Sequence, residues 1–291
     1  MRALVAPGQG AQKPGMLIPW LALDGAREQL RDWSQAADLD LVKHGTESDA
    51  ATIEDTAIAQ PLLTAAALLS YQTVEQPFDL VAGHSVGEFA AAVVAGVLTP
   101  DDALRAVAAR GRAMSRCAAG QAGGLAAVVG GSPDEATQAI KAAGAQIANC
   151  NGPGQIVAGG DTAALERLAA AAPRRARVIR LAVAGAFHTP LMAESEHPLR
   201  AALRGAAIRD AAVPFVSNRD GAALTNGRLI VEAMIGQVAK PVRWDLVLEE
   251  FAAHGIVYHL ELAPAGVLTG LAKRGLPGAQ LERATPAEAA R

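Results

Sequence analysis

One serine stands in a setting that suits a nucleophile. The stretch 81–90, VAGHSVGEFA, is a short apolar run, then Ser85 between Gly83 and Gly87, then residues that favour a helix. A G-x-S-x-G turn from strand to helix holds its serine in a strained conformation with the hydroxyl projecting from the sheet edge. The helix that follows directs its free N–H groups at the same point, which suits an anion forming on an attacked carbonyl. Ser85 is the candidate nucleophile, although the pattern alone is a weak signal.

A serine hydroxyl needs a base, and the chain offers six histidines. His188 lies in a loop directly after an expected strand, beside Phe187 and two residues before Pro190. His84 neighbours Ser85 but is expected to point away from it across a strand-like turn. His188 is therefore the candidate base, and position alone leaves a structural role equally open. Structural roles are the better interpretation for the other four histidines, which are His44, His197, His254 and His259.

Arg110 is expected to lie at the level of the nucleophile. The helix after Ser85 should run to about Gly96, and a second helix should start with Thr99 as its N-cap and Pro100 at its first position. Because both helices rise about 1.5 Å per residue, legs of similar length bring Arg110 back beside the serine. The spacing by itself also fits a solvated residue on an amphipathic helix, so both interpretations stay open.

The surrounding pattern predicts an α/β protein. Residues 3–6 predict a buried strand, and PGQGAQ at 7–12 predicts a turn whose glycines let backbone N–H groups face a ligand. A long helix is expected over 58–74. Later helices are expected over 191–203, 228–238, 244–253 and 266–274, strands over 213–217 and 256–262, and a loose tail over the last ten or so residues.

A smaller unit is inserted in this pattern. From Gly123 to Val183 the expected order is β-α-β-β-α-β, which is that of a split ferredoxin-like unit. We therefore expect a ferredoxin-like small subdomain over 123–184. A large α/β-hydrolase-like domain with a parallel sheet and the nucleophile elbow would take residues 1–122 and 185–291. The cleft between the two is the natural substrate site.

Composition narrows the function classes. The 291 residues are 51% hydrophobic, and 26 basic against 29 acidic residues leave a net charge of −3, which gives no indication of a basic surface for nucleic acid or membrane. Cys117 and Cys150 lack the C-x-x-C spacing of a zinc site. No segment approaches the about 20 apolar residues of a membrane span, and the first apolar run is too short for a signal peptide. We expect a cytoplasmic protein.

A series of short stretches occurs in a characteristic order along nearly the whole chain. They are PGQGAQ at 7–12, QP at 60–61, GHSVGE at 83–88, RGRAM at 110–114, NGPGQ at 151–155, AFHTPLM at 186–192, PVRW at 241–244 and LTGL at 268–271. In this ordered set the chain resembles the malonyl-CoA:acyl carrier protein transacylases and related acyltransferase domains of fatty acid and polyketide synthesis. The set is highly specific, whereas the serine motif alone is not.

The resemblance implies a role for each matching position. Ser85 matches the serine acylated by malonyl-CoA, and His188 matches the base that activates it. Arg110 matches the arginine that pairs with the free malonyl carboxylate, which a planar guanidinium can bind through two parallel hydrogen bonds. The backbone N–H groups of Gln9 and Val86 match the oxyanion hole.

Further positions follow from the same resemblance. Gln60 matches a substrate-binding residue, and Gln237 falls where the family orients the histidine through a main-chain carbonyl instead of a carboxylate. Phe187 points to malonyl rather than methylmalonyl, because its ring would crowd a branching methyl. Two departures are Lys240, where asparagine is usual, and Ala263 with Ala265 in APA at 263–265, where GPG is usual.

The implied reaction is ping-pong transfer of a malonyl group from malonyl-CoA to Ser85 and then to the phosphopantetheine thiol of acyl carrier protein, without metal or other cofactor. The rival is a serine thioesterase or hydrolase, which would need an acidic group to orient the histidine and gives Arg110 no purpose. A non-catalytic binder of carrier proteins would not need Ser85 with His188.

Carrier proteins are acidic, so exposed basic residues are docking candidates. These are Lys273, Arg274, Arg174, Arg175 and Arg177, and each of them fits a merely solvated face as well.

Overall fold

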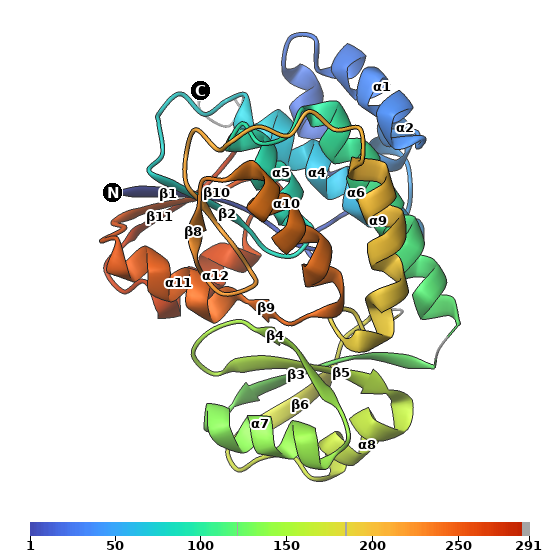
Figure 1. Cartoon of the computed structure of the whole chain (residues 1–291), viewed down its shortest axis with the longest axis vertical. Coiled ribbons are helices and arrows are strands. Elements are labelled where there is room, and N and C mark those ends of the chain that lie inside the picture. Colours follow the sequence, from blue (N-terminus) through green and yellow to red (C-terminus); the bar gives the residue numbers. More distant parts are fainter. Residues whose placement is uncertain (121, 184, 287–291) are drawn as a thin grey trace.

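The computed structural model describes residues 1–120, 122–183 and 185–286, which form a larger and a smaller lobe (Figure 1). The larger lobe is built on a six-stranded sheet with the order β11-β10-β1-β2-β7-β8. Its neighbouring strands are parallel except for the antiparallel pair β7 and β8. The strands are β1 (Arg2–Ala6), β2 (Leu80–Gly83), β7 (Phe215–Val216), β8 (Ala223–Leu224), β10 (Tyr258–Glu261) and β11 (Gln280–Arg283).

Helices cover both faces of this sheet, because its central strands are apolar on both sides. Along β1, Leu4 and Ala6 belong to one buried cluster, whereas Ala3 and Val5 belong to another. The first cluster includes residues of α1, α4, α5, α6, α9 and α10, and the second those of α11 and α12. The helices are α1 (Ala26–Ala37), α2 (Leu41–Thr46), α3 (Ala50–Glu54), α4 (Thr56–Tyr71), α5 (Gly87–Val94), α6 (Pro100–Ala119), α9 (Glu196–Leu203), α10 (Gly227–Gly236), α11 (Trp244–Ala253) and α12 (Val267–Gly275), with 3-10 turns η1 (Ile18–Ala22), η2 (Pro190–Ser195) and η3 (Gln237–Ala239).

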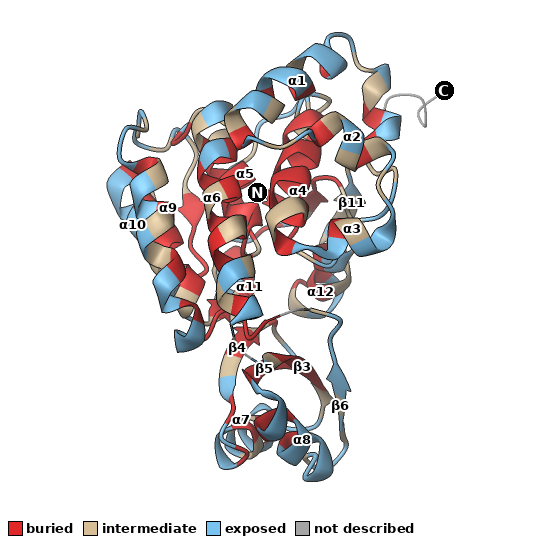
Figure 2. Ribbon diagram, turned by 90° about the vertical axis from the view of Figure 1, so that its right-hand side faces the viewer, coloured by how far each residue is buried: buried red, intermediate tan, exposed pale blue. Residues whose placement is uncertain are grey.

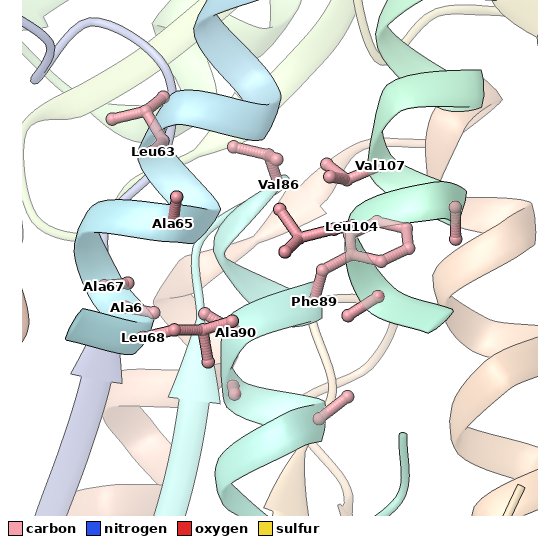
Figure 3. Packing of buried hydrophobic residues seen from close by; sticks show 14 of the residues in the cluster. Ala6, Leu63, Ala65, Ala67, Leu68, Val86, Phe89, Ala90, Leu104 and Val107 are labelled. Atoms are coloured by element: carbon pink, nitrogen blue, oxygen red, sulfur yellow. The ribbon is translucent and has the colours of Figure 1, made fainter. Parts of the chain in front are cut away.

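The helix that follows the serine is enclosed between two other helices. Figure 3 shows α5 between α4 and α6, with Phe89 and Ala90 pointing at Leu104 and Leu68. All four side chains are at most 4% exposed. This packing fixes the start of α5 relative to α6, and with it the position of Ser85, which lies two residues before the helix.

The smaller lobe holds the predicted β-α-β-β-α-β order. A five-stranded sheet with the order β6-β3-β5-β4-β9 carries α7 and α8 on one face, where they enclose a separate apolar cluster (Figures 1 and 2). Alternation along β3 puts Ala126 and Val128 in that cluster and turns Leu125 and Ala127 towards the larger lobe. The elements are β3 (Gly123–Gly130), α7 (Pro133–Ala142), β4 (Gln146–Cys150), β5 (Gln155–Asp161), α8 (Thr162–Ala170), β6 (Ala176–Arg180) and β9 (Val242–Arg243).

Strand β9 ties the lobes together. It pairs in parallel with β4, so a segment far beyond residue 184 supplies the fifth strand of the smaller sheet. The division into 1–122 with 185–291 and 123–184 stays a prediction, to which the structure adds this shared strand. Two residues of β9 carry too little pattern to reveal such a pairing from sequence.

Two expectations about single elements were wrong. The segment expected as one helix over 191–203 is a 3-10 turn, η2, followed by α9, whose third residue is Pro198. The expected tail contains the end of β11. The sequence of this strand, QLER, lacks apolar alternation, but its backbone groups form hydrogen bonds with β10. Residues 287–291 of that expectation lie outside the described residues. Among the described residues no helix is both long and apolar enough for a bilayer crossing.

Candidate active site

Ser85 sits on a tight turn between β2 and α5. Its φ is +54°, in the left-handed region that costs a non-glycine residue energy. A Cβ on Gly83 would lie 2.0 Å from a backbone atom of Gly87, and one on Gly87 would lie 2.2 Å from the carbonyl oxygen of Ala6. Both flanking positions therefore require glycine, and the predicted nucleophile elbow is confirmed as a backbone conformation.

His188 meets the serine directly. The Ser85 Oγ and His188 Nε2 atoms lie 2.7 Å apart, and Nδ1 of His188 lies 3.0 Å from the main-chain oxygen of Gln237. A carbonyl only accepts, so Nδ1 carries the proton and Nε2 is free to accept the serine proton. The histidine is 4% exposed and follows β6 in the loop before η2. The geometry is that of a Ser–His pair with a carbonyl in the third place.

Arg110 reaches the same point from α6. Its Nη2 donates to Ser85 Oγ at 3.1 Å and to Gln237 Oε1 at 3.0 Å, and its Nη1 donates to Gln60 Oε1 at 2.7 Å. The expectation from helix length is confirmed, and the alternative of a solvated residue is wrong, because Arg110 is 1% exposed. Among the described residues no carboxylate lies within ion-pair distance of this guanidinium. A buried cation held by neutral oxygens is suited to an anionic ligand.

The backbone N–H groups of Gln9 and Val86 border the same space. Both residues line the cavity with Ser85, and neither N–H donates a hydrogen bond to another group in the described parts of the chain. The side chain of Gln9 accepts from Thr56 Oγ1 at 2.6 Å, and Thr56 Oγ1 accepts from Gln60 Nε2 at 2.9 Å. Hydrogen bonds thus connect the loop after β1 to Gln60, which holds Arg110.

The cavity lies between the lobes and has a volume of about 180 Å³. The larger lobe contributes Ser85 and Arg110, and the smaller lobe contributes Leu125, Asn149 and Val157. Phe187, 5% exposed, forms part of the wall. A cavity lined by both lobes is therefore present where the sequence predicted a cleft, and substrate binding in it stays a prediction.

Burial and charge set the protonation states. Burial first, and the positive charge of Arg110 second, lower the pKa of His188 to about 3, against the carbonyl of Gln237, which raises it. Burial also lowers the pKa of Arg110 to about 10, so the guanidinium stays charged at neutral pH. The resting site therefore pairs a neutral imidazole with a cation.

We expect catalytic efficiency, kcat/KM, to stay constant when the pH is lowered past 6.5, the ordinary pKa of histidine. A base whose pKa is depressed keeps its neutral form at any pH above that lowered value, and kcat/KM reports the free enzyme. Rates of Ser85 acylation measured from about pH 8 down to about pH 5 should therefore show no acidic limb near the ordinary value. A limb centred there would contradict the assigned state of His188.

Two residues of the site had no predicted role. Asn218 Oδ1 accepts from the backbone N–H of Ser85 at 2.8 Å, and its Nδ2 donates to the Gly83 oxygen at 2.7 Å, which braces the elbow. Glu88 accepts from the backbone N–H of Asn218 at 2.7 Å and from Gln237 Nε2 at 2.6 Å. Burial raises the pKa of Glu88 to about 8, against the opposing effects of the Asn218 N–H and the Arg110 charge. The available signal for Asn218 was a polar residue at the end of a parallel strand.

The remaining histidines do not contact the nucleophile. His84 is turned towards the smaller lobe, where its Nε2 lies 3.0 Å from Asn151 Oδ1, and its ring packs against Trp244. His259 is wholly buried in β10, where burial lowers its pKa to about 4, and His254 caps α11.

The two departures from the family pattern lie beside the site rather than in it. The backbone N–H of Lys240 donates to the Gln237 oxygen at 3.2 Å, the same oxygen that faces His188. That contact uses no side-chain atom, so lysine can replace asparagine there. Ala263 follows β10, and its N–H donates to Ser70 Oγ at 3.0 Å.

Comparison with known proteins gives a consistent answer. The family model described as the acyl transferase domain matches residues 3–288. A malonyl CoA-acyl carrier protein transacylase of Mycobacterium bovis is 45% identical over 284 residues, 96% of this chain and 94% of that one. The Escherichia coli protein of the same name is 35% identical over 283 residues, 94% of this chain and 92% of that one.

Solved structures agree with the sequence relatives. A crystal structure of MCAT from Mycobacterium tuberculosis superimposes with a TM-score of 0.95 at 44% identity and covers 100% of both chains. An acyl carrier protein S-malonyltransferase from Vibrio cholerae gives a TM-score of 0.90 at 29% identity over 99% of each chain. The chain therefore belongs to the acyltransferase family that includes the malonyl-CoA:acyl carrier protein transacylases.

Proposed function

We propose that this chain transfers a malonyl group from malonyl-CoA to the phosphopantetheine thiol of acyl carrier protein, through a malonyl ester of Ser85. The observation that carries the proposal is the convergence of Ser85 Oγ, His188 Nε2 and Arg110 Nη2 within 3.1 Å contacts in one cavity. The names of the relatives supply donor and acceptor, because those proteins are malonyl CoA-acyl carrier protein transacylases.

In the first half-reaction, Ser85 Oγ forms a bond to the thioester carbonyl carbon while its proton passes to His188 Nε2. The N–H groups of Gln9 and Val86 hold the oxyanion of the tetrahedral intermediate. The carbon–sulfur bond then breaks, and the leaving thiolate of coenzyme A takes the proton from the imidazolium. In the second half-reaction the carrier thiol gives its proton to His188 and attacks the malonyl ester. The carbon–oxygen bond to Ser85 then breaks, and Ser85 Oγ takes the proton back from the imidazolium.

The malonyl carboxylate has two effects in this scheme. It pairs with Arg110 by two parallel hydrogen bonds, which offset the cost of burying both charges. It also neutralises the charge of Arg110, which after burial is the second cause of the low pKa of His188. A bound malonyl group therefore makes His188 a stronger base for the attack by Ser85. An acetyl group does neither. The Phe187 ring in the cavity wall favours malonyl over methylmalonyl, whose branching methyl needs more room.

A chase experiment tests the proposal. Malonyl-CoA labelled in the malonyl group is added to the protein, and the label is followed before and after addition of carrier protein. Label that stays on the protein and moves to the carrier supports the transferase. Rapid release of free malonate would support the hydrolase, and no label on the protein would support the non-catalytic binder.

Carrier docking is expected beside α12. Val267 of this helix is 52% exposed and lines the cavity, so the cavity opens to solvent there. Lys273 and Arg274 lie in the last turn of the same helix, within reach of an acidic partner at this opening. The other docking candidates, residues 174–177, precede or begin β6, at the end of that strand opposite to Leu181, which lines the cavity.

Reversing both charges, as Lys273→Glu with Arg274→Glu, should raise the KM for carrier protein about three- to tenfold at low salt. The KM for malonyl-CoA should change less, and added salt should reduce the difference from the wild type. Arg31→Glu on the distant α1 is the matched control. Equal effects of Arg31→Glu and the double reversal would remove α12 from the docking surface.

A further inference from the structure

The amide of Gln237 has only one orientation that its surroundings accept. Its Nε2 faces three oxygens, Glu88 Oε2 at 2.6 Å, Asn218 Oδ1 at 3.1 Å and the main-chain oxygen of Ser85 at 3.4 Å. Its Oε1 accepts from Arg110 Nη2 at 3.0 Å. A flipped amide would set oxygen against oxygens and an NH₂ group against the guanidinium, so the hydrogen-bond pattern fixes the side chain.

Glu88 is the residue that enforces this orientation. It lies in the first turn of α5, three residues after the nucleophile, and is 1% exposed. Its two oxygens meet two N–H donors, the backbone of Asn218 and the side chain of Gln237. Whether ionised or protonated, a carboxyl group has an oxygen on each arm that can accept, whereas glutamine has an NH₂ group on one arm. The reaction steps described above make no use of this buried group.

The position of Glu88 relative to Arg110 matters for selectivity. A carboxylate in direct contact with the guanidinium would occupy the place of the acyl carboxylate and compete with it. Instead, the acidic side chain stands one amide away, in the order Glu88, Gln237, Arg110. The guanidinium thus meets a neutral oxygen that a charged ligand can outcompete or join.

We propose that Glu88 is a positioning residue for selectivity towards carboxylated acyl groups. By holding the amide of Gln237, it keeps a neutral oxygen on Arg110 and leaves the guanidinium charge for the carboxylate of the acyl group. Gln237 also gives its main-chain oxygen to His188 Nδ1, so one residue joins the carboxylate-binding and the proton-transfer parts of the site. This inference rests on the proposed role of Arg110.

Glu88→Gln is the first test. Its amide can accept from only one of the two donors, so the other donor meets an NH₂ group and Gln237 loses its fixed orientation. The ratio of kcat/KM for malonyl-CoA to that for acetyl-CoA should fall about tenfold, mainly through KM for malonyl-CoA. The acetyl reaction and the rate of Ser85 labelling by a serine-directed phosphonate should stay within about threefold of wild type. Glu232→Gln, at an exposed site paired with Arg200, is the matched control that should change neither.

An exchange of the two side chains separates positioning from packing. In Glu88→Gln with Gln237→Glu, residue 88 can still accept from Asn218 and donate to residue 237, so the hydrogen bond between the two is kept. The carboxylate now lies directly on Arg110. We expect the malonyl-to-acetyl ratio to fall below that of Glu88→Gln alone, whereas a ratio restored to that of the wild type would overturn the proposal.

The outcomes distinguish this inference from the proposed function. If wild-type Ser85 is malonylated and a folded, phosphonate-reactive Glu88→Gln keeps the wild-type ratio, the role of Glu88 is refuted and the function stands. If wild-type Ser85 is not malonylated, the function fails, and protection of Ser85 from the phosphonate by free malonate tests Glu88 independently. Weaker protection in Glu88→Gln than in wild type supports its role, and equal protection overturns it.

Discussion

Replacing Ser85 with alanine should abolish malonyl transfer, with a loss of about 10⁴-fold or more in kcat. In the proposed reaction the ester forms on the Ser85 hydroxyl oxygen, which lies 2.7 Å from His188 Nε2. The fold should persist, because alanine pays about the same cost as serine for a positive φ. The measurement is transfer of labelled malonyl to carrier protein, with circular dichroism to confirm the fold.

Ser115→Ala on α6 is the control for the serine substitution. Its hydroxyl donates to Asp55 at 3.2 Å, and the residue does not line the cavity. We expect wild-type transfer from this variant. Retained labelling of a Ser85→Ala protein would show that the acyl group rests on another residue, and the elbow would then be a structural feature only.

Replacing Arg110 with alanine should lower kcat/KM for malonyl-CoA by about 100-fold or more, while that for acetyl-CoA holds or rises. Without the guanidinium, the malonyl carboxylate is buried with no partner, whereas an acetyl group brings no charge that needs one. Loss of the positive charge also removes one cause of the low pKa of His188, which helps the acetyl reaction. The measurement is the ratio of the two kcat/KM values from competition between the two donors.

Arg112→Ala is the matched control, because this other arginine of α6 donates to the Ala37 oxygen and does not line the cavity. Arg110→Lys should fall between wild type and Arg110→Ala, since it keeps the charge but loses the planar fork. An Arg110→Ala protein with unchanged donor preference would remove the arginine from carboxylate binding.

The parts of the site that sequence could predict are those with local causes. The elbow at Ser85 follows from two glycines at fixed spacing, and the return of Arg110 follows from two helices of known rise. His188 was a candidate because the sequence predicted a strand ending shortly before it, whereas β6 ends at Arg180. Its contact with the serine depends on how β6 and η2 pack, which no local pattern contains.

The parts that sequence missed depend on contacts between distant segments. Asn218 and Glu88 meet through a backbone N–H, and such a contact leaves no mark on residue type beyond polarity. The third member beside His188 is a main-chain oxygen, which the side chain at 237 does not reveal, so this contact was predicted from the family resemblance alone. Strand β9 joins the smaller sheet through only two residues, and two residues are too few for a sequence pattern to distinguish a strand from a loop.

The most direct test of the central claim is to locate the acyl group. The protein is mixed with malonyl-CoA alone, quenched, digested and mapped by mass spectrometry, and a parallel sample receives carrier protein before the quench. We predict one malonyl group per chain on the peptide that contains Ser85, and its loss when carrier protein is present. A malonyl group on any other residue, or a Ser85 peptide that never carries one, would contradict the account.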